Sequence, residues 1–281
     1  MPELPEVQTI VDVLIAGGLP GTQIVDAFVR WPKTIATSTP AAFCRQVSGK
    51  IVLSIRRRAK YIIFDLSEGY HLVVHLRMTG QLFLSDNSHF EIPHIHVVLK
   101  LVNKQSLIFR DTRKFGRFYL VTRLDSIFEK LGPEPLSTSF TAKYLFKILS
   151  KRHRQIKPLL LDQTFLSGLG NIYADEALWA AQIHPMQSAH TLTWEKVQVL
   201  HRAIRRVLRQ GIQNAGTSLG NGKSNFVSPR NEPGRNKNYL MVFRRTGHPC
   251  KRCGYRIEKI FVGQRSTHIC FQCQIVSDEN R

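Results

Sequence analysis

The chain has 281 residues, 43% of them hydrophobic, so it is long enough for two domains that each bury a core. Its 40 lysine and arginine residues outnumber 20 acidic residues, and the formal net charge of +20 favours a polyanionic partner. No apolar run approaches the roughly 18 residues of a membrane span, and no signal peptide is visible. We therefore expect a soluble intracellular chain, which favours nucleic acid over a membrane surface.

The first half of the chain predicts one helix followed by a β-domain. Residues 3–16 place Val7, Ile10, Val11 and Leu14 on one helical face, and a glycine pair follows. Residues 23–122 then form short β-rich runs separated by turn residues. Their number and spacing favour an antiparallel sandwich or barrel over alternating βαβ units. The clearest runs are QIVDAFVRW, KIVLSI, KYIIFDL, HLVVHLRM, HIHVVLKL, SLIFR and GRFYLV.

The second half predicts helices. LGPEPLS at 131–137 marks a domain boundary, and FTAKYLFKILSKR follows with a helical pattern. SGLGNIYADEALWAA predicts a glycine turn that enters a helix. The pattern TWEKVQVLHRAIRRVLRQG indicates a further helix from a Thr193 N-cap to a stop at Gly211. Residues 216–238 are rich in Gly, Asn, Ser and basic residues, so we expect a mobile loop there.

Four cysteines near the end of the chain form the sharpest motif. Their spacing, Cys-x2-Cys-x16-Cys-x2-Cys, predicts a structural zinc site with four thiolate ligands: Cys250, Cys253, Cys270 and Cys273. The intervening residues predict a hairpin whose cations can face phosphates: Arg256, Lys259 and Arg265. An ordinary zinc-ribbon interaction module explains the motif as well. The fifth cysteine, Cys44, is expected to be a small buried hydrophobe.

Three further segments suit nucleic acid, and each also has a purely structural interpretation. Asn171 stands where a glycine turn enters a helix, which suits a phosphate site or a simple cap. RRRAKYIIF holds four cations in five positions, as a charged edge strand also does. FRDTRKFGRF mixes cations with aromatic residues that suit base stacking, but such turns are common. Met78, in HLRMTG, is more typical of a core than of a wedge.

The opening MPELPEV suggests covalent chemistry. Removal of Met1 would leave Pro2 as a secondary amine, and its attack on a sugar C1′ gives an iminium ion that favours β-elimination. An α-amino group titrates near pH ~8, and nearby lysines lower that value, so a neutral fraction exists at pH 7. Glu3 is placed to move protons, although an acid at a helix start is also simply stabilising.

PELPEV, KPLLLDQTFLSGLGNIYADEALW and the four-cysteine module together resemble the formamidopyrimidine-DNA glycosylases, bacterial base-excision enzymes, over essentially the whole chain. The resemblance implies an α+β fold with an N-terminal antiparallel β-sandwich flanked by helices, a helix–two-turn–helix domain and a C-terminal zinc finger. It also implies a cytoplasmic, nucleoid-associated monomer that holds duplex DNA in a basic cleft between two lobes. The expected divisions are a catalytic domain at 2–132, a linker and first helix at 133–150, a DNA-binding domain at 151–243 with a lesion-recognition loop at 216–238, a zinc finger at 244–275 and a tail at 276–281.

The resemblance also assigns roles to residues. Pro2 matches the nucleophile, Glu3 the acid/base, and Lys60 the lysine that contacts the lesion-site phosphate and assists elimination. Three residues match positions that hold the backbone beside the flipped nucleotide: Lys157, Asn171 and Arg265, the last grouped with the catalytic residues. Three match the trio that fills the gap left by the flipped base: Met78, Arg113 and Phe115. Glu6 matches a residue near the lesion pocket.

The activity implied is removal of oxidised purines, chiefly 8-oxoguanine and formamidopyrimidines, from duplex DNA, followed by β,δ-elimination at the abasic site, with one structural zinc ion. Two alternatives stay open. An endonuclease VIII-like enzyme for oxidised pyrimidines would share the scaffold, although PELPEV and the gap-filling Arg113 and Phe115 argue against it. A non-enzymatic zinc-ribbon DNA-binding protein would explain the charge and the cysteines but not the Pro-Glu start. The loop at 216–238 carries more Asn, Gly and basic residues than is usual in the family.

Overall fold

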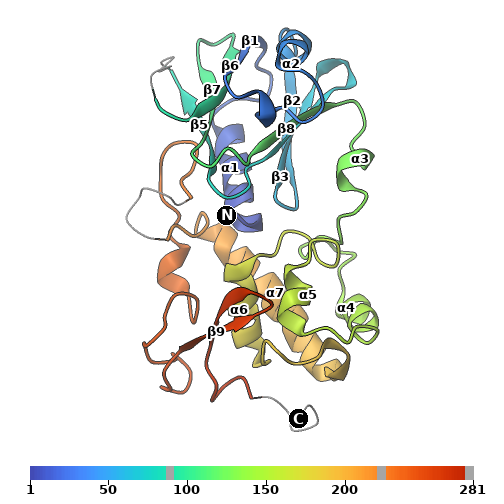
Figure 1. Ribbon diagram of the computed structural model, residues 1–281, viewed down its shortest axis with the longest axis vertical. Coiled ribbons are helices and arrows are strands. Elements are labelled where there is room, and N and C mark those ends of the chain that lie inside the picture. Colours follow the sequence, from blue (N-terminus) through green and yellow to red (C-terminus); the bar gives the residue numbers. More distant parts are fainter. Residues whose placement is uncertain (87–91, 220–225, 276–281) are drawn as a thin grey trace. The chain divides into compact units, whose positions relative to one another are not determined.

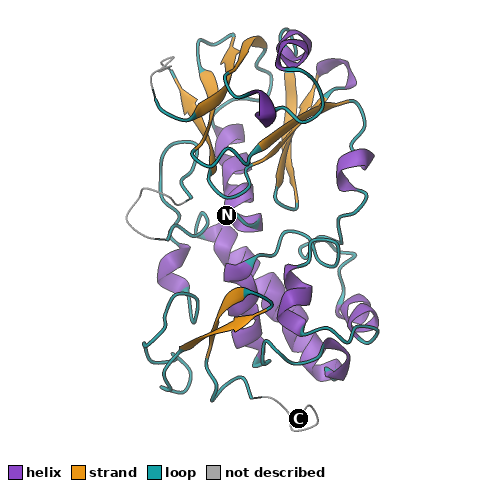
Figure 2. Ribbon diagram, viewed as in Figure 1, coloured by secondary structure: helices purple, strands orange, loops and turns teal. Residues whose placement is uncertain are grey.

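The computed structural model describes residues 1–86, 92–219 and 226–275, so the predicted tail at 276–281 lies outside the described residues. The chain forms two compact units (Figure 1). The first unit comprises Met1–Glu129 and Gly211–Lys237, and the second comprises Lys130–Gln210 and Asn238–Arg281. Strands dominate the first unit, and helices dominate the second apart from one hairpin (Figure 2).

Eight strands and three α-helices form the described part of the first unit, and their order is α1, β1, α2, β2 to β8, α3. Their bounds are α1 Leu4–Ala16, β1 Ile24–Val29, α2 Pro40–Val47, β2 Val52–Arg58, β3 Tyr61–Leu66, β4 His71–His75, β5 Gly80–Ser85, β6 Ile95–Leu101, β7 Ser106–Asp111, β8 Arg117–Val121 and α3 Asp125–Phe128. Short 3-10 turns occupy Pro32–Thr34 and Ser67–Gly69.

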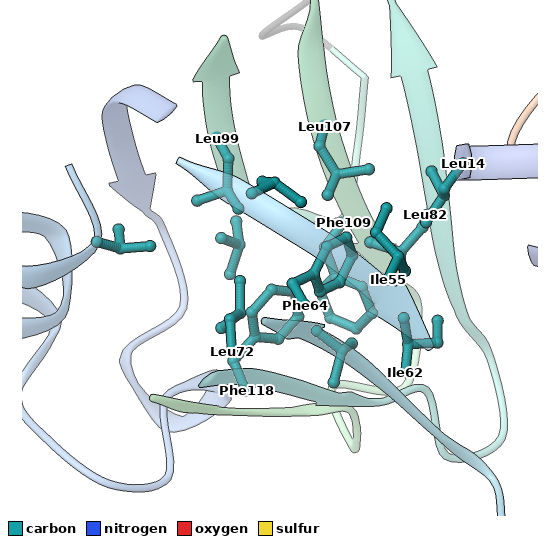
Figure 3. Packing of buried hydrophobic residues seen from close by; sticks show 14 of the residues in the cluster. Leu14, Ile55, Ile62, Phe64, Leu72, Leu82, Leu99, Leu107, Phe109 and Phe118 are labelled. Carbon is teal, nitrogen blue, oxygen red and sulfur yellow. The ribbon is translucent and has the colours of Figure 1, made fainter. Parts of the chain in front are cut away.

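The strands form two four-stranded sheets with the orders β1-β6-β7-β5 and β2-β3-β4-β8. Every pair in them is antiparallel, which confirms the predicted antiparallel sandwich. Alternate residues of each strand point inward, so apolar side chains of both sheets meet in one core (Figure 3). Phe109 of β7 and Phe118 of β8 lie edge to face in that core, with ring centroids 5.0 Å apart. The expectation for Cys44 holds in part, because it packs against this core but is only partly buried.

The described part of the second unit contains four α-helices, a β-hairpin and the cysteine module. The bounds are α4 Ala142–Leu149, α5 Ile156–Leu161, α6 Asn171–Ala181, α7 Trp194–Gln213, β9 Glu258–Val262 and β10 Arg265–Ile269, with 3-10 turns at Ala189–Thr191 and Asn236–Tyr239. The last three residues of α7 group with the first unit. The predicted stop at Gly211 is therefore two residues early, since the helix continues to Gln213.

The predicted boundary at 131–137 is held by one arginine of α7. Arg205 donates 2.8 Å hydrogen bonds from its guanidinium to the carbonyls of Pro135 and Ser137. Gly132 lies so close to the main chain of Phe165 that an added Cβ would come within 2.6 Å of it. The segment is thus a fixed part of the second unit. No helix among the described residues is long and apolar enough to cross a membrane.

Replacing Phe118 by alanine should lower the free energy of unfolding by about 3–5 kcal/mol, because its ring is 1% exposed and leaves a cavity beside Phe109. Urea unfolding followed by circular dichroism measures the change. Leu53→Ala is the matched control: its side chain is 59% exposed, and the expected change is within about 0.5 kcal/mol. Equal losses for the two variants would contradict the assignment of Phe118 to the core.

Candidate functional site

The start of the chain is buried at the N-terminus of α1. Glu3 is the N-cap residue, and its main-chain N–H donates a 2.8 Å hydrogen bond to Oε2 of Glu6. The Glu3 carboxylate in turn accepts from the main-chain N–H of Glu6, which completes a capping box. Pro2 and Glu3 are both buried. The capping box therefore fixes Pro2 directly before the first turn of the helix.

Glu6 also joins this helix to the predicted lesion loop. Its Oε1 accepts a 2.7 Å hydrogen bond from the main-chain N–H of Thr217. Beside it Gly216 adopts φ +79, where an added Cβ would lie 3.0 Å from the Glu6 side chain. Asn236 closes the base of the loop, since it donates to the Gly216 carbonyl and to Thr217 Oγ1, each at 3.0 Å. Our expectation of a mobile loop is therefore wrong for these flanks, because buried hydrogen bonds hold them. Residues 220–225 lie outside the described residues.

Lys60 is a buried lysine, not a solvated one. It follows Ala59, which adopts φ +54, in the turn between β2 and β3, and it is 4% exposed. His75, at the end of β4, was not singled out from the sequence, and it lies beside Tyr61 with ring centroids 4.4 Å apart. Burial, with the charges of Arg77 and Lys60, lowers the pKa of His75 from 6.5 to about 3. A neutral imidazole thus stands next to a buried ammonium.

The hydrogen bonding of His75 defines its tautomer. Its Nδ1 accepts a 3.0 Å hydrogen bond from the main-chain N–H of Arg77, so the proton of the neutral ring resides on Nε2. The ring is consequently a donor at Nε2 across the neutral pH range. A signal for His75 was present in HLVVHLRM, where a histidine ends an apolar strand, but its proximity to Lys60 depends on strand pairing.

The predicted gap-filling trio is brought together on two adjacent turns of the first unit. The guanidinium of Arg113 lies 3.0 Å from Met78 Sδ and 4.8 Å from the centroid of the Phe115 ring. Met78 and Phe115 are each 45% exposed. Met78 is therefore a surface residue and not a core residue. Two apolar side chains and one cation form an exposed cluster, which we call the wedge.

Lys157 occupies a different place from the one expected. It is fully buried in the second unit, and its ammonium lies 2.6 Å from Asp175 Oδ1, a residue of α6. The same ammonium donates to Thr267 Oγ1 at 2.7 Å and to the Ser266 carbonyl at 3.0 Å. Asp175 Oδ2 accepts the main-chain N–H of His268 at 2.9 Å. A buried ammonium needs such partners. Lys157 therefore holds the β9–β10 hairpin through its hydrogen bonds to Ser266 and Thr267.

Arg265 belongs to this supported hairpin, and Asn171 contacts it from α6. The Asn171 side chain, at the first residue of α6, donates a 2.9 Å hydrogen bond to the Ser266 carbonyl. Gly263 and Gln264 adopt φ values of +53 and +61, as a tight two-residue hairpin turn requires. Arg265 follows that turn and is exposed. The Asn171 side chain is thus committed to the hairpin and does not cap its own helix.

The four predicted cysteines form one cluster. Their sulfur atoms all lie within 4.8 Å of one another, and all four thiols are free of disulfides. Although burial opposes it, N–H donation from the main chain of Arg252 and Cys253 and from Trp179 lowers the pKa of Cys250 to about 6. The Trp179 indole N–H lies 3.3 Å from Cys250 Sγ. Four close sulfurs with N–H donors suit tetrahedral zinc, and they leave no position for a catalytic water.

Helix α6 carries the cysteine module. Glu176 accepts hydrogen bonds of 2.9 Å from the main-chain N–H groups of residues 241, 242 and 243, which lead into the module. Arg252 lies over the Trp179 ring at 4.2 Å and donates to the Trp179 carbonyl. Burial raises the pKa of Glu176, which the three N–H donors partly offset. One helix thus fixes both the hairpin and residues 241–243, which precede the cysteine module.

The comparisons with known proteins agree with this arrangement. The profile of the formamidopyrimidine-DNA glycosylase N-terminal domain matches residues 1–118, the profile of the H2TH domain of that enzyme matches 131–221, and a zinc finger found in FPG and IleRS matches 247–275. The chain is 47% identical over 274 residues to the formamidopyrimidine-DNA glycosylase of Protochlamydia amoebophila, which covers 98% of this chain and 99% of the relative. The chain belongs to the formamidopyrimidine-DNA glycosylase family.

Other members of the family are similar over their full length. The formamidopyrimidine-DNA glycosylase of Pelotomaculum thermopropionicum is 45% identical, with 98% of this chain and 100% of the relative covered. Among solved structures, a point mutant of the Lactococcus lactis FPG in complex with a Fapy-dG containing DNA has a TM-score of 0.90 at 35% identity, and covers 98% of this chain and 100% of that chain. A Lactococcus lactis Fpg complex with an abasic site containing DNA has a TM-score of 0.89 at 35% identity, with the same coverage. These similarities confirm the predicted family and fold of this glycosylase.

The buried neutral His75 should make the first unit sensitive to acid. Below pH 6.5 the unfolded chain protonates this ring, whereas the folded chain does so only near pH 3. This group alone therefore lowers the free energy of unfolding by about 1.4 kcal/mol per pH unit as pH falls through that window. Urea unfolding at several pH values should show a shallower pH dependence for His75→Asn than for the unmodified chain. The exposed His94→Asn serves as control, and identical slopes for all three proteins would contradict a neutral, buried His75.

Replacing Cys250 by serine should release zinc from the protein and weaken its binding to duplex DNA. The serine hydroxyl is not ionised at neutral pH, so one of four thiolate ligands is lost. Metal content by mass spectrometry and duplex affinity by fluorescence anisotropy measure both effects. Cys44→Ser, in the first unit, should leave both unchanged. Full retention of zinc and affinity by the Cys250 variant would exclude a structural zinc site at these cysteines.

Proposed function

We propose that this glycosylase removes oxidised purines, chiefly 8-oxoguanine and formamidopyrimidines opposite cytosine, from duplex DNA and then cleaves the strand by β,δ-elimination. As a family member the chain is a base-excision repair DNA glycosylase with AP lyase activity. Relatives from Lactococcus lactis bind DNA containing Fapy-dG or an abasic site, which supports this substrate class. The observation that carries the proposal is the buried Pro2–Glu3 pair, fixed at the N-cap of α1.

Pro2 is the proposed nucleophile after removal of Met1. Its nitrogen forms a bond to C1′ of the damaged nucleotide while the bond from C1′ to the base breaks. The base leaves with the electron pair and takes up a proton, and the Pro2 nitrogen loses its own proton. Glu3 delivers a proton to the sugar ring oxygen as the ring opens, which yields the iminium ion. Loss of a C2′ proton then expels the 3′ phosphate, and a second elimination expels the 5′ phosphate. A secondary amine suits this sequence, since its iminium keeps a positive charge.

Lys60 and His75 are the proposed partners of the phosphate at the lesion. Lys60 supplies a buried positive charge, and His75 supplies a neutral Nε2–H donor. A phosphate that approaches this pair gains charge-assisted hydrogen bonds in a partly dehydrated setting, where such bonds are stronger than in water. The leaving-group phosphate is therefore stabilised as its negative charge develops during elimination.

The remaining predicted residues have separate proposed roles. The wedge fills the gap left by the flipped nucleotide, with Arg113 directed at the orphan cytosine. Asn171 holds the supported hairpin from α6, and the exposed Arg265 of that hairpin contacts the DNA backbone. We assign Lys157 a supporting role beneath that hairpin, because its ammonium is buried against Asp175. Glu6 links the lesion loop to the N-terminal helix.

The cysteine cluster is proposed to hold a single structural zinc ion. We also propose the domain divisions at 2–132, 133–150, 151–243 and 244–275, and a monomer that acts on nucleoid DNA in the cytoplasm. Support for a DNA partner comes from the net charge of +20 and from the DNA-bound relatives.

Borohydride trapping on a duplex with one 8-oxoguanine opposite cytosine tests the nucleophile. Reduction of the iminium should give a covalent adduct whose peptide mapping places the DNA on Pro2. Pro2→Gly should lose most of this adduct while it keeps lesion binding, because a primary amine in a more flexible chain replaces the fixed secondary amine. Pro20→Gly, in the loop after α1, should trap as the unmodified chain does.

The same experiment distinguishes the alternatives. An adduct on an oxidised-pyrimidine duplex alone would favour the endonuclease VIII-like activity. Absence of any adduct, in protein that mass spectrometry shows to begin at Pro2, would contradict the proposed chemistry. Protein that retains Met1 has an amide at Pro2 and should give no adduct, which provides an internal negative control.

A further inference from the structure

Asp111 is a fully buried carboxylate at the junction of the two turns that carry the wedge. It ends β7, and it pairs across the sheet with Gly80, the first residue of β5. Met78 precedes Gly80 by two residues, and Arg113 follows Asp111 by two. A single buried side chain therefore stands between the two segments that must act together in the gap-filling step.

The Asp111 carboxylate accepts hydrogen bonds from both turns. The Thr79 hydroxyl donates to Oδ1 from the first turn, and the main-chain N–H of Arg113 donates to the same oxygen at 3.2 Å from the second. The main-chain N–H of Gly116 donates to Oδ2 at 2.8 Å and closes the far end of the second turn. Removing these acceptors would leave the 3.2 Å hydrogen bond from the main-chain N–H of Arg113 to Thr79 Oγ1 to link the two turns without the buried carboxylate.

The main chain of Asp111 is fixed as well. Its N–H donates to the His94 carbonyl at 3.0 Å, and its carbonyl accepts from the buried His96 ring at 2.7 Å. The main chain that carries the carboxylate is therefore held by groups outside the two turns.

Both turns also close on the ring of Phe109. A Cβ added at Gly80 would lie 2.9 Å from this ring, and one added at Gly116 would lie 2.3 Å from it. Lys114 completes the second turn with φ +59, and its ammonium lies 4.2 Å from the centroid of the Trp31 ring. The Phe109 ring thus limits how closely the two turns approach the core, and the Asp111 carboxylate links them by hydrogen bonds.

We propose that Asp111 is the positioning residue of the wedge, which holds Met78 and Arg113 in the relative placement needed to fill the gap and to read the orphan base. This inference rests on the proposed function. Asp111 does not touch the DNA in this account; it acts through Arg113, whose main chain it holds. It should therefore determine how strongly the enzyme distinguishes cytosine from adenine opposite the lesion.

An asparagine at this position would test the requirement for two acceptors. A carboxylate offers acceptors at both oxygens, whereas an amide presents a donor on one side. In Asp111→Asn that donor would face either the Gly116 N–H or the Thr79 and Arg113 donors, and one turn would move. Small displacements at a reacting geometry are costly, and a shift near 1 Å can reduce a rate by about a hundredfold.

Single-turnover excision of 8-oxoguanine opposite cytosine and opposite adenine is the decisive measurement, with trapping on a preformed abasic duplex as the second readout. Asp111→Asn should slow excision opposite cytosine by roughly tenfold to a hundredfold. The cytosine-to-adenine ratio should narrow by about fivefold to a hundredfold, the discrimination that one good base contact supplies. Trapping on the abasic duplex should stay near that of the unmodified chain, because Pro2 and Glu3 are unchanged and no base needs to be extruded.

Matched variants separate positioning from folding. Thr79→Val removes the hydroxyl that links the first turn to Asp111, and it should narrow the cytosine-to-adenine excision ratio as Asp111→Asn does. Thr79→Ser keeps the hydroxyl and should show the ratio of the unmodified chain. Asp125→Asn, an exposed carboxylate of the same unit, is the surface control. If Asp111→Asn does not fold, the Thr79 pair carries the test.

Two results would overturn the inference. An unchanged ratio in folded Asp111→Asn or in Thr79→Val would show that the tether does not position Arg113. Equal losses of excision and of abasic-site trapping would show a general structural role instead. Failure of the proposed function has a different signature, since the unmodified chain itself would then give no adduct on either duplex.

Discussion

Buried carboxylates that accept main-chain hydrogen bonds are the constraint on which the functional parts of this fold depend. Four such carboxylates are each at most 5% exposed, and each accepts a main-chain N–H from another segment of its unit: Glu6, Asp111, Asp175 and Glu176. A carboxylate removed from water without such donors costs several kcal/mol. Each of these segments is therefore stabilised in the conformation that brings its N–H groups to the buried carboxylate.

The regular elements and the turns have different roles in this fold. The two sheets share one apolar core, and the turns at their ends carry the side chains proposed to face the DNA. In the second unit, three side chains of α6 make these contacts. Asp175 accepts a hydrogen bond from the hairpin, Glu176 accepts hydrogen bonds from residues 241–243, and the Trp179 indole lies against Cys250 Sγ. Helix α6 therefore fixes the position of the hairpin that carries Arg265.

The sequence predicts what depends on local patterns. The apolar period of α1, the alternation in the strands and the cysteine spacing each reflect a short-range rule, and all three are confirmed in the fold. Contacts between residues that lie far apart in the sequence do not follow from such local patterns. The burial of Lys157 follows from Asp175, which stands eighteen positions later on another helix. The lowered pKa of His75 follows from its burial in the sheet, with smaller effects from the charges of Arg77 and Lys60. Neither residue type nor spacing contains that information, because the partners are chosen by tertiary packing.

The loop at 216–238 is a second case in which tertiary contacts are not predictable from the local sequence. Its composition is that of a segment without a core, and composition alone indicates mobility. Yet Thr217 donates to a carboxylate near the start of the chain, and Phe226 packs against the apolar core of the first unit.

The placement of the tryptophans has a separate, optical consequence. Of three in the chain, Trp31 lies under the Lys114 ammonium of the wedge turn, and Trp179 lies against a cysteine sulfur. The ultraviolet emission of the unlabelled protein therefore contains one signal from beside the wedge turn and one from beside the cysteine cluster.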